Sequence, residues 1–257
     1  MNMKRWCVRV RDILIRDLPQ GLGAGTRRSR RRLAIGLLGA ALGAAQAADF
    51  VPVQTFYVPV PEDQRLEAMV AIAGGRTGDY APRDPIHSVL SIAVFANDTQ
   101  IHYDQWENGF DPNIAKPLNV YAAGNPGGTQ IWGDGDAANG YPPGFPDDTL
   151  NAGDVIRLTN TVVSATRGAA IGFDGGDKLA ASRPVAVTRM GWATGSGTSF
   201  AGANEVYDTA FWGTAFQCPV GTDISDTQDY QMFEYAGLSI MAGAGGATVQ
   251  VDADADG

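Results

Sequence analysis

Cysteine is scarce in this chain. Its 257 residues include only two, Cys7 and Cys218. Cys7 lies in an N-terminal segment that we expect to be removed, so Cys218 would stand alone and an internal disulfide is excluded. A domain of about 200 residues buries enough apolar surface to fold without one. The apolar neighbours of Cys218 indicate a buried, inert thiol rather than a nucleophile.

Basic side chains are also scarce over most of the chain. Residues 1–47 hold ten of the 19 Lys and Arg, so residues 48–257 carry 9 basic and 26 acidic side chains, a formal charge of −17. Such a surface repels nucleic acid and attracts cations and basic partners. Of these 26 acids 21 are Asp, which is a loop residue and a hard-cation ligand. We therefore expect no nucleic-acid partner and expect the charge to lie in loops.

The chain has no apolar run long enough to span a membrane, and its most extended apolar run fits an export signal. An arginine cluster precedes the 13-residue run Leu33–Ala45, which ends in Ala45-Gln46-Ala47. A basic region, a short apolar run and a small-x-small site together indicate a secretory signal. The run is shorter than the roughly 20 residues that a membrane span needs. We predict a signal peptide over 1–47, no membrane span, and a secreted or cell-surface location in a bacterium.

The export route stays open between two alternatives. Ser29-Arg30-Arg31-Arg32-Leu33 resembles the twin-arginine signal, although it lacks the Phe and Lys of the fullest form. The general secretory route fits the same three-part pattern.

Helical periodicity is missing after Ala47, and alternation of apolar and polar residues takes its place. Alternating segments, which indicate half-buried strands, are Gln54–Val60, Ile156–Val162 and Thr248–Asp252. Turn residues at 96–99 and 243–246 predict hairpins between neighbouring strands. With 33 Gly and 14 Pro in the chain, we predict an all-β, antiparallel β-sandwich domain over 48–250 with long Gly/Pro/Asp-rich loops. Its longest loop region, 108–151, is a candidate for function.

No catalytic constellation is found. The segment Gly197-Thr198-Ser199-Phe200-Ala201 is similar to the serine segment of subtilisin-type proteases, whose chemistry also needs a His and an Asp. The only histidines, His87 and His102, lack the His-Gly-Thr setting of that family, and we reject the assignment. His102 and Asp104 share one face of a strand, and we interpret them as an exposed polar pair on a strand edge. We predict no catalytic residues.

Two Asp-rich segments are candidate Ca²⁺ loops, because closely spaced Asp side chains in a Gly-containing loop supply several hard oxygen ligands. The first offers Asp134, Asp136 and Asn139. The second offers Asp252, Asp254 and Asp256, followed by Gly257. The alternative for both is a solvated turn, in which Asp, Asn and Gly are common. We also expect 251–257 to begin an Asp-rich linker or Ca²⁺ loop of a longer protein whose downstream domains are missing.

A family resemblance is carried by Gly176–Arg189, which contains Ser182-Arg183-Pro184-Val185-Ala186-Val187, and by Trp212-Gly213-Thr214-Ala215-Phe216. These motifs resemble the N-terminal domain of IgG Fc-binding-type proteins and related parts of large bacterial surface proteins. The resemblance spans roughly residues 50–250. It implies a non-enzymatic extracellular β domain with no catalytic residues, and it does not by itself imply binding to immunoglobulin.

These observations predict a non-enzymatic extracellular adhesion or structural module, with Ca²⁺ as its candidate stabilising ion. Its partner would be an unknown extracellular protein or glycan. The alternative is a secreted carbohydrate-active domain, either a binding module or a glycoside hydrolase, that uses the acids of the 108–151 loop.

Overall fold

The computed structural model describes six parts of the chain: residues 49–59, 85–162, 171–193, 201–217, 240–243 and 246–251. The chain divides into a unit over Phe50–Met241, which holds all the described strands, and a second unit formed by the two ends. The predicted signal peptide lies outside the described residues. The described residues of the second unit form neither helix nor strand, so the strand expected at Thr248–Asp252 is not found over 248–251.

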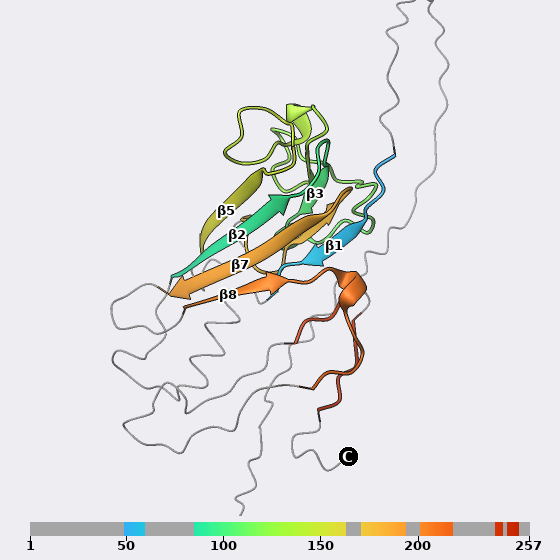
Figure 1. The fold of residues 1–257 in the computed structure, drawn as a ribbon, viewed down its shortest axis with the longest axis vertical. Helices are drawn as coiled ribbons and strands as arrows, with labels where there is room; N and C mark the ends of the chain where they lie inside the picture. The colour runs from blue at the N-terminus through green and yellow to red at the C-terminus, as the bar shows by residue number, and fades with distance from the viewer. Residues whose placement is uncertain are drawn as a thin grey trace, which may run out of the picture. The chain divides into compact units, whose positions relative to one another are not determined.

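The described strands form two antiparallel sheets of four strands each (Figure 1). The first has the order β1 (Gln54–Tyr57), β6 (Lys178–Ala181), β3 (Ile101–Asp104) and β4 (Gln130–Trp132). The second has the order β5 (Val155–Val162), β2 (Ile86–Val94), β7 (Val185–Ala193) and β8 (Ala201–Val206). All pairs within the two sheets are antiparallel.

One hydrophobic core joins the two sheets, and each of the eight described strands or its immediate extension contributes to it. In the second sheet Ile92 lies in register between Ile156 and Val187, and all three are 0% exposed. Burying one such side chain stabilises the fold by about 1.5–3 kcal/mol. The predicted β-sandwich is therefore confirmed, and so are the period-two patterns expected in 54–58 and 156–161, where alternate residues face the core.

The inward positions of β7 are apolar at the start of the strand and polar further along. Val185 and Val187 are 4% and 0% exposed, and Pro184 directly precedes the strand, where no ladder donor is needed. Arg189, the next inward residue, is only 1% exposed and lies opposite Leu90. One charged side chain is therefore buried at this position of β7, beside an apolar residue of the core.

The turn at 96–99 is not the hairpin that its residues predict. It follows β2 and precedes β3, which belong to different sheets, so it carries the chain from one layer to the other. Within it Asp98 has a φ of 54°, and the Thr99 hydroxyl donates to the carbonyl of Ala96 at 2.7 Å. Turn residues indicate a reversal of the chain but do not indicate which strands pair. β2 and β3 therefore do not pair with each other; their apolar residues pack against one another across the core.

Among the residues that the structure describes, three short 3-10 helices interrupt the loops: η1 (Trp106–Asn108), η2 (Ala137–Asn139) and η4 (Thr209–Phe211). Within the described ranges, no helix has the length and apolar character that crossing a membrane requires.

Candidate functional site

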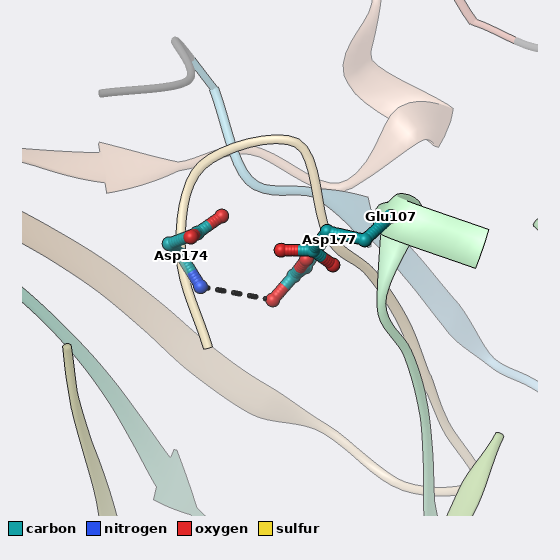
Figure 2. Close-up of side chains that lie close together, drawn as sticks. All are labelled: Glu107, Asp174 and Asp177. Atoms are coloured by element: carbon teal, nitrogen blue, oxygen red, sulfur yellow. Dashed lines mark hydrogen bonds between the residues drawn. The ribbon is translucent and has the colours of Figure 1, made fainter. Parts of the chain in front are cut away.

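Three carboxylates meet where η1 lies against the turn that precedes β6. Glu107 belongs to η1, whereas Asp174 and Asp177 belong to the turn. One oxygen from each lies within 4.8 Å of the others, and Figure 2 shows the side chains converging from the two segments. Asp177 is 0% and Asp174 3% exposed, and Glu107 is partly buried. We call these three residues the acid cluster.

Asp177 is held by donors from both sides of the cluster. The hydroxyl of Tyr103, a core residue of β3, donates to Asp177 Oδ2 at 2.6 Å, and the backbone N–H of Asp174 donates to the same oxygen at 3.0 Å. The N–H of Trp106 donates to Asp177 Oδ1 at 3.4 Å. The carboxylate therefore closes its own turn and fastens that turn to β3 and η1.

Glycine is required inside this turn. Gly176 has a φ of +108°, and a Cβ there would lie 2.8 Å from Cδ1 of Trp106. Phe173 packs edge-on against Tyr103 at a ring distance of 5.3 Å. The turn is thus pressed against the aromatic core by close packing as well as by hydrogen bonds.

The acid cluster also contacts the second sheet. Asn160 of β5 donates from Nδ2 to Asp174 Oδ2 at 3.1 Å. β3 and β6 belong to the first sheet and β5 to the second, so polar groups of both sheets converge here. The cluster links the two layers.

Burial governs the electrostatics of the cluster. It raises the pKa of Asp177 well above its ordinary value, and the charge of Asp174 raises it further, while the Tyr103 hydrogen bond acts in the opposite direction. Burial, followed by the charge of Asp177, raises the pKa of Tyr103 well above 10.0. Carboxylates this close together are stable only with a shared proton or a positive charge among them. Chemically, the arrangement is suited to holding a proton or a hard cation.

The first predicted Ca²⁺ loop lies between β4 and the end of η2, at the surface. Asp134 and Asp136 are exposed, and Asn139 is partly buried. Asp134 accepts from the N–H of Asp136 at 2.9 Å and from Nδ2 of Asn139 at 2.9 Å, and Asp136 accepts from the N–H of Ala138 at 3.1 Å. The structure brings the three side chains into one turn, where they satisfy donors of that turn. Calcium binding there stays a prediction.

Asp148, which follows this turn in the sequence, holds the start of the turn in place with hydrogen bonds. Its carboxylate accepts from the N–H groups of Gly133 at 2.6 Å, Asp134 at 3.1 Å and Gly135 at 2.8 Å. Asp148 is 5% exposed, and burial raises its pKa. A carboxylate with three amide donors is a structural anchor for the segment after β4.

His102 and Asp104 are buried, not exposed on a strand edge as their pattern suggested. β3 lies between β6 and β4, and the two residues are 4% and 2% exposed. His102 Nδ1 donates to the carbonyl of Ile114 at 2.6 Å, and its ring stacks on Phe50 at 3.6 Å between centroids. The prediction was wrong because β3 is an inner strand, and its outer face is covered by Phe50 and by the loop that contains Asp111 and Ile114.

Asp104 belongs to a network that fastens the following loop to the sheet. It accepts from the N–H of Asp111 at 2.7 Å, and Asp111 accepts in turn from the N–H groups of Leu118 at 2.5 Å and Asn119 at 3.0 Å. Burial raises the pKa of Asp104 to about 6, against the lowering effects of the Asp111 hydrogen bond and of Lys178. Burial lowers the pKa of His102.

The remaining sequence candidates lie mostly outside the described residues. These are Asp252, Asp254 and Asp256, together with Ser199 and Cys218. Ala201 begins strand β8 rather than the helix that a subtilisin-type serine segment requires, which agrees with the rejection of that assignment.

Sequence reasoning missed the acid cluster. The pattern Asp174-Gly175-Gly176-Asp177 is visible as a turn, but nothing in the sequence connects it to Glu107. Comparison with protein-family models, with curated proteins and with solved structures found no match to this chain.

Proposed function

We propose that residues 48–250 form a non-enzymatic extracellular adhesion or structural module of a bacterial surface or secreted protein. The confirmed β-sandwich supports this proposal, as do the charge of −17 after residue 47, the export signal predicted from the sequence and the resemblance to the IgG Fc-binding-type N-terminal domain. The proposal does not include binding to immunoglobulin, which the resemblance does not imply.

The burial of the acid cluster is the observation that carries the proposal. A glycoside hydrolase needs two carboxyl groups that face a sugar, about 5–9.5 Å apart. Here Asp177 and Asp174 are 0% and 3% exposed and accept hydrogen bonds from Tyr103 and Asn160. Carboxylates in such positions hold the fold together, which favours a module over a hydrolase.

Calcium stabilisation is the second part of the proposal. Asp134, Asp136 and Asn139 are the ligands proposed from the sequence, and the acid cluster offers a second set of carboxylates whose oxygens lie within 4.8 Å of one another. An ion in the acid cluster would join segments that are distant in the chain, whereas an ion at the surface turn would cross-link residues of one short segment. A bound ion would therefore stabilise the folded state.

Thermal unfolding of the full chain tests the calcium part. An ion at about 100 times its Kd stabilises a fold by roughly 2.7 kcal/mol. For a domain of this size we expect millimolar Ca²⁺ to raise Tm by about 5–10 °C relative to EDTA. Equal Tm values in Ca²⁺ and EDTA would overturn this part.

Substitutions locate the ion. Asp177→Asn should abolish the Tm difference if the acid cluster binds Ca²⁺, whereas Asp134→Asn with Asp136→Asn should abolish it if the surface turn does. Asp147→Asn is the matched control, because Asp147 is exposed and accepts only from the Thr149 hydroxyl among the contacts described.

Two further measurements test the module itself. The exported protein should begin at Ala48 when its N-terminus is sequenced, and an uncut N-terminus would contradict the export proposal. A screen of chromogenic glycosides should give no turnover, and turnover by the wild type would establish the hydrolase alternative instead.

A further inference from the structure

The outer face of the second sheet carries an aromatic patch that the proposed function does not use. Outward residues align across β5, β2 and β7 in two adjacent rows: Thr161, His87 and Trp192, then Thr159, Val89 and Met190. We call these six residues the Trp192 face. Figure 1 shows β2 and β7 side by side, with no described segment drawn across them.

The first row of the Trp192 face is a flat, partly exposed aromatic strip. Trp192 is 41% exposed, and its ring stacks on His87 with 5.5 Å between centroids and 29° between planes. His87 Nδ1 lies 3.0 Å from the hydroxyl oxygen of Thr161, which fixes the orientation of the imidazole. An apolar ring surface beside hydroxyl and imidazole groups combines packing area with hydrogen-bonding groups.

The second row continues this surface. Met190 is 37% exposed, whereas Val89 between Met190 and Thr159 is only 3% exposed, so the row is closely packed. Trp192 and Met190 remain partly exposed, so the fold does not gain the full stabilisation that burying these side chains would give. Exposed aromatic side chains with adjoining polar groups are typical of surfaces that bind a ligand.

Charge narrows the kind of ligand. The two rows contain no Asp, Glu, Lys or Arg, on a chain whose residues 48–257 carry a charge of −17. The next row holds one of each sign, Arg157 on β5 and Glu205 on β8. An anionic ligand would be repelled by the acidic protein and find no basic group in the two rows. An uncharged, hydroxyl-rich ligand with a flat apolar side complements the patch.

We propose that the Trp192 face binds a neutral β-linked glucan, with the apolar side of a pyranose ring stacked on Trp192. The Thr161 and Thr159 hydroxyls supply hydrogen bonds to the sugar hydroxyls, and the His87 ring extends the stacking surface beside Trp192. The inference deepens the proposed adhesion function by naming a surface and a partner. It depends on that function only for access to extracellular glycan, and it is independent of calcium.

Calorimetric titration of the full chain with cellohexaose and with laminarihexaose tests the inference. We expect at least one of them to bind with a Kd below about 1 mM, and an oligogalacturonate of the same length to bind at least tenfold more weakly. Trp192→Ala should lower the affinity at least tenfold and Thr161→Val severalfold. Trp192→Tyr keeps a flat ring and should retain most of the binding, which separates loss of stacking from loss of folding.

Phe211→Ala is the matched control, since Phe211 is an aromatic residue that is 78% exposed on η4, outside the Trp192 face. It should leave the affinity unchanged. The inference is overturned if neither glucan binds at 1 mM, if Trp192→Ala binds as well as the wild type, or if the oligogalacturonate binds best. Sedimentation that shows a dimer abolished by Trp192→Ala, without glucan binding, would assign the face to a second copy of the chain. The Tm test with Ca²⁺ can fail without affecting any of these outcomes.

Discussion

The acid cluster and the turn after β4 both place several carboxyl groups in short, Gly-containing segments, yet their environments are opposite. Asp177 is 0% exposed and bonded to the hydroxyl of Tyr103 on another strand. Asp134 and Asp136 are exposed and bonded to donors of their own turn. The same residue type therefore connects distant parts of the fold in one place and shapes a local turn in the other.

The difference shows that the burial of an Asp side chain, rather than the number of acids in its segment, determines how much that Asp contributes to the stability of the fold. Removing a buried acceptor leaves each former donor unsatisfied, at a cost of about 1–3 kcal/mol apiece. Removing an exposed acceptor allows water to replace it. The acid cluster and the surface turn should therefore respond very differently to the same substitution.

The largest effect is expected from Asp177→Ala. It would deprive the Tyr103 hydroxyl and the N–H groups of Asp174 and Trp106 of their acceptor, and we expect a loss of about 3–4 kcal/mol in the free energy of unfolding. Asp134→Ala, the surface counterpart, should cost less than about 1 kcal/mol. Urea denaturation measures both, and equal losses would show that the two environments do not differ as described.

Gly133→Ala tests the close packing of the surface turn against the backbone of Thr99. Gly133 and Gly135 have nearly equal φ values of +83° and +85°, but only at Gly133 would a Cβ collide with the carbonyl oxygen of Thr99, at 2.2 Å. We expect a loss of about 3 kcal/mol at Gly133 and about 1 kcal/mol at Gly135, where only the left-handed backbone opposes the change. Similar unfolding free energies for the two variants would contradict this contact.

Asp104 should make the stability depend on pH in the direction opposite to ordinary acid denaturation. Its pKa of about 6 in the folded protein exceeds the ordinary 3.8, so the folded state binds the proton more tightly. The stabilisation of the folded state by protonated Asp104 is complete below pH 3.8 and is lost as the pH rises through 6. The pKa difference corresponds to roughly 3 kcal/mol before solvent screening, and we expect about 1–2 kcal/mol.

Asp104→Asn isolates that contribution. Buried His102, whose pKa is lowered, acts in the opposite direction on acidification, whereas Asp177, whose pKa is raised, adds to the effect. The informative quantity is therefore the difference between the wild type and Asp104→Asn in unfolding free energy between pH 4 and pH 7. The variant should gain about 1–2 kcal/mol relative to the wild type at neutral pH. A difference that is constant over this range would refute the raised pKa.

The smallest effect is expected from Asp136→Ala. Asp136 accepts from the N–H of Ala138 at the start of η2, and loss of such a cap costs about 0.5–1 kcal/mol. Asp208 caps η4 in the same way but is 7% exposed and also accepts from the N–H of Thr55 at 3.3 Å. Asp208→Ala should therefore cost more, and the reverse order would contradict the role assigned to burial.

The alternation within single strands could be predicted because it is a local property. Phe56, Ile156 and Leu158 were recognisable as inward residues from their immediate neighbours, and each is at most 2% exposed. The Gly-containing loops were recognisable for the same reason. Asp134, Asp136 and Asn139 do share one turn, as their spacing suggested.

Pairing and burial could not be predicted in this way. His102 and Asp104 looked like an exposed edge pair, because the sequence does not show that β3 lies between β6 and β4. The proximity of Glu107 to Asp174 and Asp177 depends on the same arrangement, since η1 follows β3 and the turn precedes β6, the strand that pairs with β3. Residues so far apart in the chain reveal no joint pattern.

The sequence by itself determined that this protein is built from half-buried strands and acidic loops, because side-chain alternation, turn residues and charge act over a few residues. Only the tertiary structure decided that the 96–99 turn crosses between the sheets, that β3 is an inner strand, and that three of the acids are brought together between the layers. These outcomes depend on which apolar faces pack against each other, and that packing is a property of the whole core.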